Sequence, residues 1–273
     1  MPSPTRVKKL PAVENVQASG TATLRLPLGQ TYHSIQVGSG NPIGSITGVR
    51  VLVNGGTIQE FSGAQAAALN QFFNAGQAST AFMLPIWFDA PWLRTRNARE
   101  LGALGAGPQS DQNPRPVQTA SIEFDLDATA DPKLEAWAKV SPPTPSGLVR
   151  KLKRFTVTVA AAGEVEITDI PSADLLAGIH LTKATDDISR VRIVQDSFDL
   201  FDRTKAINNA YLADLGTVPR IPQTGWFHVD PREDGDGGEV YSPASAQDFR
   251  IVATVGSAET MTFMAEQLGA VPV

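Results

Sequence analysis

The stretches ITGVRV at Ile46–Val51 and ISRVRI at Ile188–Ile193 share one pattern of apolar and polar residues and lie 142 positions apart. In both, β-branched residues are interspersed with polar residues, arginine or glycine, which is typical of a half-buried β-strand. A strand that occurs once in each half of a 273-residue chain predicts that a whole folding unit is present twice.

Further matches flank these hexapeptides at nearly the same separation. They are Leu26-Pro27 with Ile170-Pro171 and Ile35 with Ile179, both 144 apart, Phe61 with Phe201, 140 apart, and Phe88-Asp89 with Val229-Asp230, 141 apart. A separation that drifts by only a few residues indicates two ordered copies with small insertions and deletions in their loops. The alternative, a chance match between aliphatic runs, does not explain why helix starts and prolines match as well.

Each copy is also expected to contain one helix in a connection between strands. The first begins at Ser62, where Gln65 completes a capping box, and it ends at Gly76. The second begins at Asp202 and ends at Gly216. Both predicted helices have the same length and occupy equivalent places in the two copies.

Most of the remaining chain consists of short strand-like runs bounded by turn residues, with 23 glycines and 20 prolines in total. Such runs are typical of β-sandwiches and barrels, and copies of about 120 to 130 residues suit an eight-stranded jelly roll. The predicted fold is therefore all-β: two tandem eight-stranded jelly-roll β-barrels, a double jelly roll, with short connecting helices.

The predicted domain organisation has four parts. An N-terminal arm at 1–19 precedes the first jelly roll at 20–139. The segment 140–147 (VSPPTPSG) is rich in proline and is predicted to be a stiff linker, followed by the second jelly roll at 148–273.

Two segments of the first copy depart from the strand pattern. Asp131-Pro132 predicts the start of a short helix that carries Leu134 and Trp137. The segment Ala90–Val117 has no counterpart in the second copy, and we interpret it as a long exposed loop or an interaction arm.

Composition excludes several classes of protein. A hydrophobic content of 42% excludes wholesale disorder, and the absence of cysteine excludes disulfides and cysteine-based zinc sites. A net charge of −5 argues against a dedicated nucleic-acid-binding protein, because phosphate recognition needs an excess of basic residues. No membrane span or signal peptide is recognisable, so the chain is expected to fold in an aqueous compartment.

The acidic residues are the best candidates for a chemical role. Asp125 and Asp127 are two apart on a strand-like run, so they are candidate ligands for a shared Ca²⁺ or simply a solvated sheet end. The run Asp230–Glu239 carries five carboxylates without EF-hand spacing, and a solvated, mobile loop is predicted there. No catalytic or cofactor-binding residue is expected.

The three histidines do not form a recognisable metal-binding motif. His33, His180 and His228 are therefore predicted to be ordinary strand residues. Two alternative functions remain open: a glycan-active enzyme on a tandem jelly-roll scaffold, with an acidic pair as acid and base, and a carbohydrate-binding module. In the second alternative the stacking platforms would be Trp87, Trp92 or Trp226.

Basic residues cluster in three places. The first part of the arm, Met1–Pro11, carries Arg6, Lys8 and Lys9 and lacks apolar periodicity, so on its own it is predicted to be disordered. Its expected partner is either an anionic membrane or a neighbouring subunit that it clamps. The other two clusters, candidate patches for acidic partners, are Arg94, Arg96 and Arg99, and Arg150, Lys151, Lys153 and Arg154.

Several stretches in collinear order carry a resemblance. They are LPLGQTY at Leu26–Tyr32, FDLD at Phe124–Asp127, TPSGL at Thr144–Leu148, EITDIP at Glu166–Pro171 and AGIHL at Ala177–Leu181. Together they resemble the major capsid protein of corticoviruses, the membrane-containing marine bacteriophages, from about Leu10 to Gly216.

The resemblance implies a structural protein without an active site. It implies a double jelly roll that forms homotrimeric, pseudo-hexagonal capsomers of an icosahedral shell over an internal lipid membrane. The expected location is the virion capsid, assembled in the cytoplasm of the host bacterium. The expected partners are further copies of the chain, other virion proteins and the membrane, with no sequence-specific binding of nucleic acid. Structural Ca²⁺ is associated with such capsids and is the only ion that the resemblance suggests.

Overall fold

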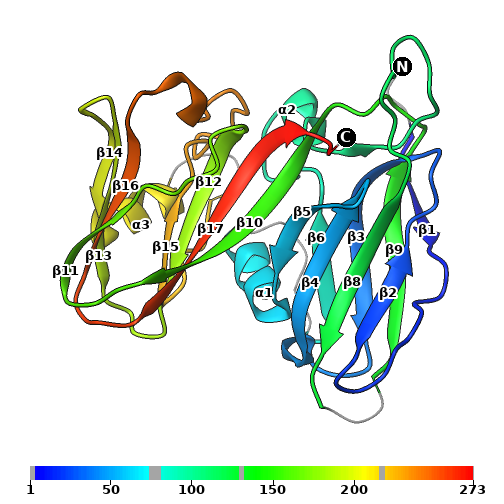
Figure 1. The fold of residues 1–273 in the computed structure, drawn as a ribbon, viewed down its shortest axis with the longest axis horizontal. Helices are drawn as coiled ribbons and strands as arrows, with labels where there is room; N and C mark the ends of the chain where they lie inside the picture. Colours follow the sequence, from blue (N-terminus) through cyan, green and yellow to red (C-terminus); the bar gives the residue numbers. More distant parts are fainter. Residues whose placement is uncertain (1–3, 74–80, 129–131, 215–218, 273) are drawn as a thin grey trace.

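The computed structural model describes residues 4–73, 81–128, 132–214 and 219–272. Within these ranges the chain forms two sandwich-like units side by side, the first on the right of Figure 1 in blue to green and the second on the left in green to red. None of the described helices is long and apolar enough to cross a membrane.

The first unit packs a five-stranded sheet face to face against four strands of a second sheet. One sheet has the order β1 (Arg6–Lys9), β9 (Leu134–Ser141), β3 (Thr31–Ser39), β6 (Met83–Trp87), with the short β7 (Leu104–Gly105) also beside β3. The facing strands have the order β2 (Thr21–Arg25), β8 (Ala120–Leu126), β4 (Ile46–Val53), β5 (Gly56–Phe61). Fully buried Tyr32, Ile35 and Phe124 lie in the core between the sheets.

The second unit repeats this order strand for strand. One set is β10 (Leu148–Thr158), β17 (Thr260–Ala270), β12 (Leu175–Thr182), β15 (Trp226–Val229), and the other is β11 (Gly163–Ile167), β16 (Phe249–Val255), β13 (Ile188–Gln195), β14 (Phe198–Thr204). Helix α1 (Gly63–Phe72) follows β5, and α3 (Lys205–Asp214) follows β14, so the helices occupy equivalent connections. The predicted fold of two eight-stranded jelly rolls is confirmed. Short 3-10 turns lie at Ile43–Ser45 and Pro243–Ser245.

The capping box predicted for the first helix is present. The Gln65 backbone N–H donates to Ser62 Oγ at 3.2 Å, and the Ser62 backbone N–H donates to Gln65 Oε1 at 2.9 Å. The predicted start of the second helix at Asp202 is wrong, because Asp202 lies in β14 and pairs with Arg190 on the adjacent strand. Its true start, Lys205, lies 142 residues after Gly63, the same separation as that of the two hexapeptides. The predicted ends at Gly76 and Gly216 lie outside the described residues.

The short helix predicted after Asp131-Pro132 is a strand instead. In β9, Leu134, Ala136, Ala138 and Val140 are buried and alternate with more exposed residues, a period of two rather than 3.6. The strand also includes Val140 and Ser141, which the sequence had placed in the linker. The connection between the units therefore starts at Pro142.

The part of the N-terminal arm that carries its basic residues is itself a strand and not a disordered segment. Residues Arg6–Lys9 form β1, which pairs antiparallel with β9 from Arg6 opposite Val140 to Lys9 opposite Trp137. All four side chains are exposed, because β1 is the edge strand of its sheet. β1 is not recognisable as a strand from its sequence, because RVKK contains a single apolar residue.

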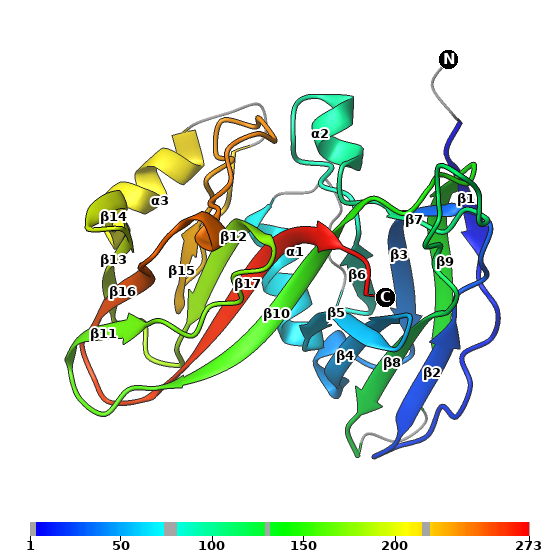
Figure 2. The same ribbon diagram turned by 45° about the horizontal axis from the view of Figure 1, so that its top comes forward.

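The two units share one continuous sheet. Strand β10 of the second unit lies parallel to β5 of the first, with Leu152 opposite Gln59. This contact joins four strands of each unit into an eight-stranded sheet in the order β15-β12-β17-β10-β5-β4-β8-β2. In both views α1 lies beside this junction, between the two units (Figures 1 and 2).

Candidate functional site

The junction between the jelly rolls contains a buried network of charges. Glu266 of β17 is fully buried, and its two carboxylate oxygens accept hydrogen bonds from Arg150 Nη2 at 3.0 Å and Arg232 Nη2 at 2.6 Å. Burial alone would raise the pKa of Glu266, but the attraction of Arg150 and Arg232 outweighs it and holds that pKa well below its usual range. Glu266 is therefore ionised at neutral pH and ties β10, β17 and the loop after β15 together.

The network continues into the acidic loop that was predicted to be solvated and mobile. Asp230 is 4% exposed; its Oδ2 accepts from Arg220 Nε at 2.8 Å, and its Oδ1 accepts from the Arg232 backbone N–H at 3.1 Å. Glu233 accepts two hydrogen bonds from Arg203, at 2.8 and 2.9 Å. The prediction is wrong for this part of the loop, because its carboxylates are partners of arginines that are distant in sequence.

Aromatic rings fill the space beside these charges. Phe73 of the first unit stacks on Trp92, with ring centroids 3.8 Å apart, and Phe72 stacks on His228 of the second unit at 3.9 Å. His180 Nδ1 lies 2.9 Å from His228 Nδ1. Burial lowers the pKa of His228 well below its usual value, and the neighbouring His180 lowers it further. His228 is therefore neutral at pH 7.

All three histidines are strand residues, as predicted. Two of them, His180 and His228, also lie in the contact between the two units. His180 lies on β12 and His228 on β15, and both are buried where the second jelly roll meets α1 of the first. His33 lies on β3 with its Nδ1 3.6 Å from Asp89 Oδ2. Sequence spacing could not predict the meeting of His180 and His228, because the strands that carry them are paired only in the folded chain.

The segment Ala90–Val117 packs against the second unit and is not simply an exposed loop. Trp92 is 1% exposed, and the segment contains α2 (Arg96–Glu100) as well as β7. Its backbone bonds to the second unit, because the Arg94 N–H donates to the Gly235 carbonyl at 2.9 Å and the Gly102 carbonyl accepts from the Arg150 N–H at 3.1 Å. These contacts hold the segment against the charge network.

Burial also changes the interpretation of the tryptophans and of one basic cluster. Trp87 and Trp92 are buried, and Trp226 stacks on His228 with centroids 5.3 Å apart, so none of the three forms an open platform for a sugar ring. Arg150 belongs to the buried network, while Lys151 pairs with Asp174 at 2.7 Å. The run that starts at Arg150 is therefore not a surface patch for acidic partners.

The candidate calcium ligands do not fit a metal site. Both carboxylate oxygens of Asp125 accept from Arg50, at 2.6 and 3.0 Å, and this bond lowers the pKa of Asp125. Asp127 lies beyond the end of β8, where its backbone carbonyl accepts from the Ser19 N–H at 2.7 Å. A cation beside Asp125 would compete with a guanidinium, and no group of three potential ligand residues occurs within the described ranges.

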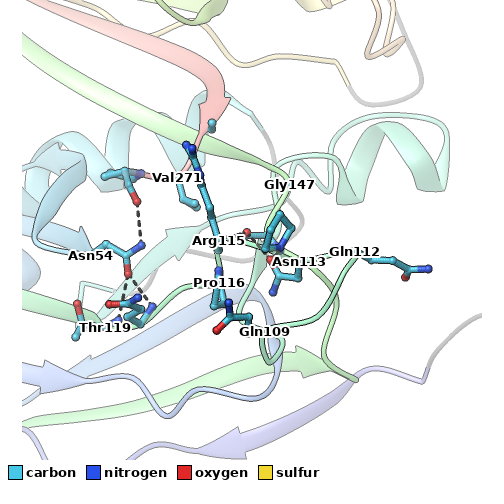
Figure 3. Close-up of a pocket in the computed structure, with 14 residues that line it drawn as sticks. Asn54, Gln109, Gln112, Asn113, Arg115, Pro116, Thr119, Gly147 and Val271 are labelled. Carbon is cyan, nitrogen blue, oxygen red and sulfur yellow. Dashed lines mark hydrogen bonds between the residues drawn. The ribbon is translucent and has the colours of Figure 1, made fainter.

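An open hollow of about 600 Å³ lies where the C-terminal residues meet the first unit (Figure 3). Asn54 stabilises one wall, since its side chain accepts from the Gln118 and Thr119 N–H groups at 2.7 and 3.2 Å and donates to the Pro272 carbonyl at 2.9 Å. The lining is mainly amides, prolines and hydroxyls, with Arg115 as its charged member. It therefore lacks the carboxylate pair that a glycosidase requires.

Sequence reasoning missed the charge network, although one signal was present. Glu266 interrupts the apolar run of β17, MTFMAEQLGA, where a charged residue is expected to be paired if the strand is buried. The arginines that pair with it come from positions 150 and 232, and neither position is close to it in sequence.

Comparison with known proteins places this architecture in a family. The viral coat protein P2 N-terminal domain family matches residues 7–141, and the viral coat protein P2 C-terminal domain family matches residues 149–271. The major capsid protein P2 of Pseudoalteromonas phage PM2 is 29% identical, over 95% of each chain.

Solved structures show the same fold. The crystal structure of the major capsid protein P2 from bacteriophage PM2 superposes with a TM-score of 0.84 at 23% identity, over 98% of each chain. The STIV MCP matches with a TM-score of 0.70 at 10% identity, over 98% of this chain and 97% of that one, and the PBCV-1 virus capsid with 0.66 at 9%, over 98% and 94%. Because its two halves match the two domains of one coat protein in the same order, the chain belongs to the viral coat protein P2 family.

Proposed function

We propose that the protein is the major capsid protein of a PM2-like phage and that it builds an icosahedral shell from homotrimeric, pseudo-hexagonal capsomers. Membership of the coat protein family supports the capsid role. The shell encloses an internal lipid membrane in this proposal, and assembly takes place in the host cytoplasm with other virion proteins as partners.

One observation carries the proposal: the strand order of the first jelly roll is repeated in the second. A subunit with two similar units presents two similar flanks, so three subunits present six and can tile a surface as a hexagon does. Arg150 fixes the two units of one chain relative to each other, because its Nη1 donates to the Trp87 carbonyl of the first unit at 3.1 Å and its own carbonyl accepts from Gln59 Nε2 at 3.0 Å. A fixed pair of units is what such a building block requires.

No site among the described residues supports the enzyme alternative. The best acidic candidate, Asp125, is bonded to Arg50, and the acidic loop is engaged by Arg220 and Arg203. The carbohydrate-binding alternative loses its platforms because Trp87 and Trp92 are buried. The match to the coat protein family supports a structural role instead.

Native mass spectrometry of the purified chain tests the proposal. The expected main species has three times the chain mass of 29.0 kDa. A chain that stays monomeric at high micromolar concentration contradicts the homotrimer. Flotation of the assembled protein with anionic and with neutral vesicles tests the membrane separately, and failure to bind either kind contradicts a direct membrane contact.

A further inference from the structure

The junction inside the chain covers two apolar residues, one from each unit. Leu152 of β10 is 2% exposed and lies opposite Gln59 of β5, while Leu69 of α1 is 5% exposed. Leu69 and Leu152 line the same small internal gap. Strand β5 and helix α1, at the edge of the first unit, thus contact β10, the outermost strand of the second unit's part of the shared sheet.

The first unit presents the counterpart of Leu152 to solvent. Leu152 pairs with Glu266 in the β10–β17 ladder, and Val7 pairs with Lys139 in the β1–β9 ladder. Ile35 and Ile179 are equivalent in the two copies, and they pair with Ala138 and Ala265. The residues that follow these alanines, Lys139 and Glu266, are therefore equivalent too. Val7 is therefore the counterpart of Leu152, but it is 74% exposed.

The second unit presents the counterpart of Leu69 in the same way. Helices α1 and α3 are 142 residues apart along their whole length, so Tyr211 corresponds to Leu69. Tyr211 is 49% exposed, and Ile207, one turn earlier on the same face, is 51% exposed. Arg203 lies 4.8 Å from the Tyr211 ring and is bonded to Glu233, which holds this apolar surface in place.

Strand β14, which precedes α3, is an edge strand with exposed apolar side chains. β14 is the last strand of its sheet, and its Phe198 and Leu200 are 75% and 45% exposed. Between them lies Asp199, whereas β1 carries basic residues on either side of Val7. Exposed apolar residues with complementary charges are typical of surfaces that meet a partner.

These two surfaces cannot meet within one chain, because β1 and the pair β14–α3 lie at opposite ends of the molecule in both views (Figures 1 and 2). We infer that β14 and α3 of one copy receive β1 of a second copy, as β5 and α1 receive β10 within the chain. Val7 then packs near Tyr211 of the neighbour. The contact is head-to-tail, and in the proposed homotrimer three such contacts close a ring in which each copy supplies two of six positions. The inference rests on the proposed homotrimer and adds which surfaces form it.

Crosslinking tests this pairing directly, because the chain has no cysteine of its own. In the double variant Val7→Cys/Tyr211→Cys, a short bis-maleimide is expected to link chains into species of two and three chains and no larger. Each single variant is expected to remain one chain, because a head-to-tail contact brings Val7 to Tyr211 and never to a second Val7. Two-chain species from Val7→Cys alone would overturn the inference.

A charge variant separates this inference from the proposed function. Val7→Asp is expected to fold and to shift the mass from three chains to one, whereas Leu28→Asp, at a residue 44% exposed outside both surfaces, is expected to leave trimers intact. If wild-type trimers form and Val7→Asp trimers are equally stable, the pairing is wrong while the homotrimer stands. If the wild type is a monomer, the homotrimer and this pairing both fail.

Discussion

Arg232 Nη2 donates to Glu266 Oε1 at 2.6 Å in the interior between the two jelly rolls, where neither side chain is more than 2% exposed. Two buried charges stabilise a structure only when their geometry and remaining hydrogen bonds compensate for the loss of water. Glu266 meets this condition because Arg150 occupies its second oxygen. The carboxylate therefore holds β10, β17 and the loop after β15 together within the second jelly roll.

Replacing Glu266 by Gln is expected to lower the free energy of unfolding by about 3 to 5 kcal/mol, because two buried guanidinium groups lose their counter-charge. Urea unfolding followed by tryptophan fluorescence measures the change. The matched control is Glu100→Gln, which removes an exposed partner of Arg96 and is expected to cost less than about 1 kcal/mol. Equal stability of the two variants would contradict the role of Glu266.

Acid is expected to destabilise the fold. The pKa of His228 lies below its usual 6.5 in the folded chain, so the unfolded chain takes up the proton first and stability falls as the pH drops below about 6.5. The pKa of Glu266 is lowered too, and its contribution is lost further down, below about 4.5. Unfolding in urea at pH 7.5 and 5.5 should show lower stability at pH 5.5. The His228→Phe variant, which can still stack on Phe72, should show a smaller drop, and an identical drop would rule out His228 as the cause.

Removing the cap of α1 tests the local argument for that helix. Ser62→Ala deletes the acceptor for the Gln65 N–H and is expected to cost about 1 kcal/mol of stability. Ser62→Asp restores an acceptor and should recover most of the loss. If Ser62→Asp is no better than Ser62→Ala, the capping box does not stabilise the helix.

Asp125 is expected to act through Arg50 and not through calcium. Asp125→Asn weakens a half-exposed ion pair and should lower stability by less than about 1 kcal/mol. Any rise in Tm on adding CaCl₂ should be the same for the wild type and the variant. A calcium-dependent rise that only the wild type shows would restore Asp125 as a ligand.

The repeat predicted the fold because alternation and turn residues are local signals. ITGVRV and ISRVRI do form the equivalent strands β4 and β13. The prediction of a helix at Leu134 was wrong because the spacing of Leu134 and Trp137 is compatible with a helix. The pairing of this segment with β3, which makes it a strand, is not visible in the sequence. β1 could not be recognised because its strand character comes from β9 and not from its own residues.

The junction residues were beyond prediction for a different reason. Arg150, Arg220, Arg232 and Glu266 are ordinary charged residues in sequence, and their partners are fixed only by the way in which β10, β17 and the loop after β15 converge. The asymmetry between exposed Val7 and buried Leu152 likewise emerges only when the ladders of both units are compared.

The shared sheet of β5 and β10 has a mechanical consequence. A hinge between the two units would have to break the strand contact at Gln59 and Leu152 and the hydrogen bond from Arg150 to the Trp87 carbonyl. Thermal bending inside one chain is therefore strongly opposed, and each chain behaves as a stiff tile. Any layer built from such tiles must acquire its curvature at the seams between chains, so the radius of the layer is determined by the contacts that individual copies make with one another.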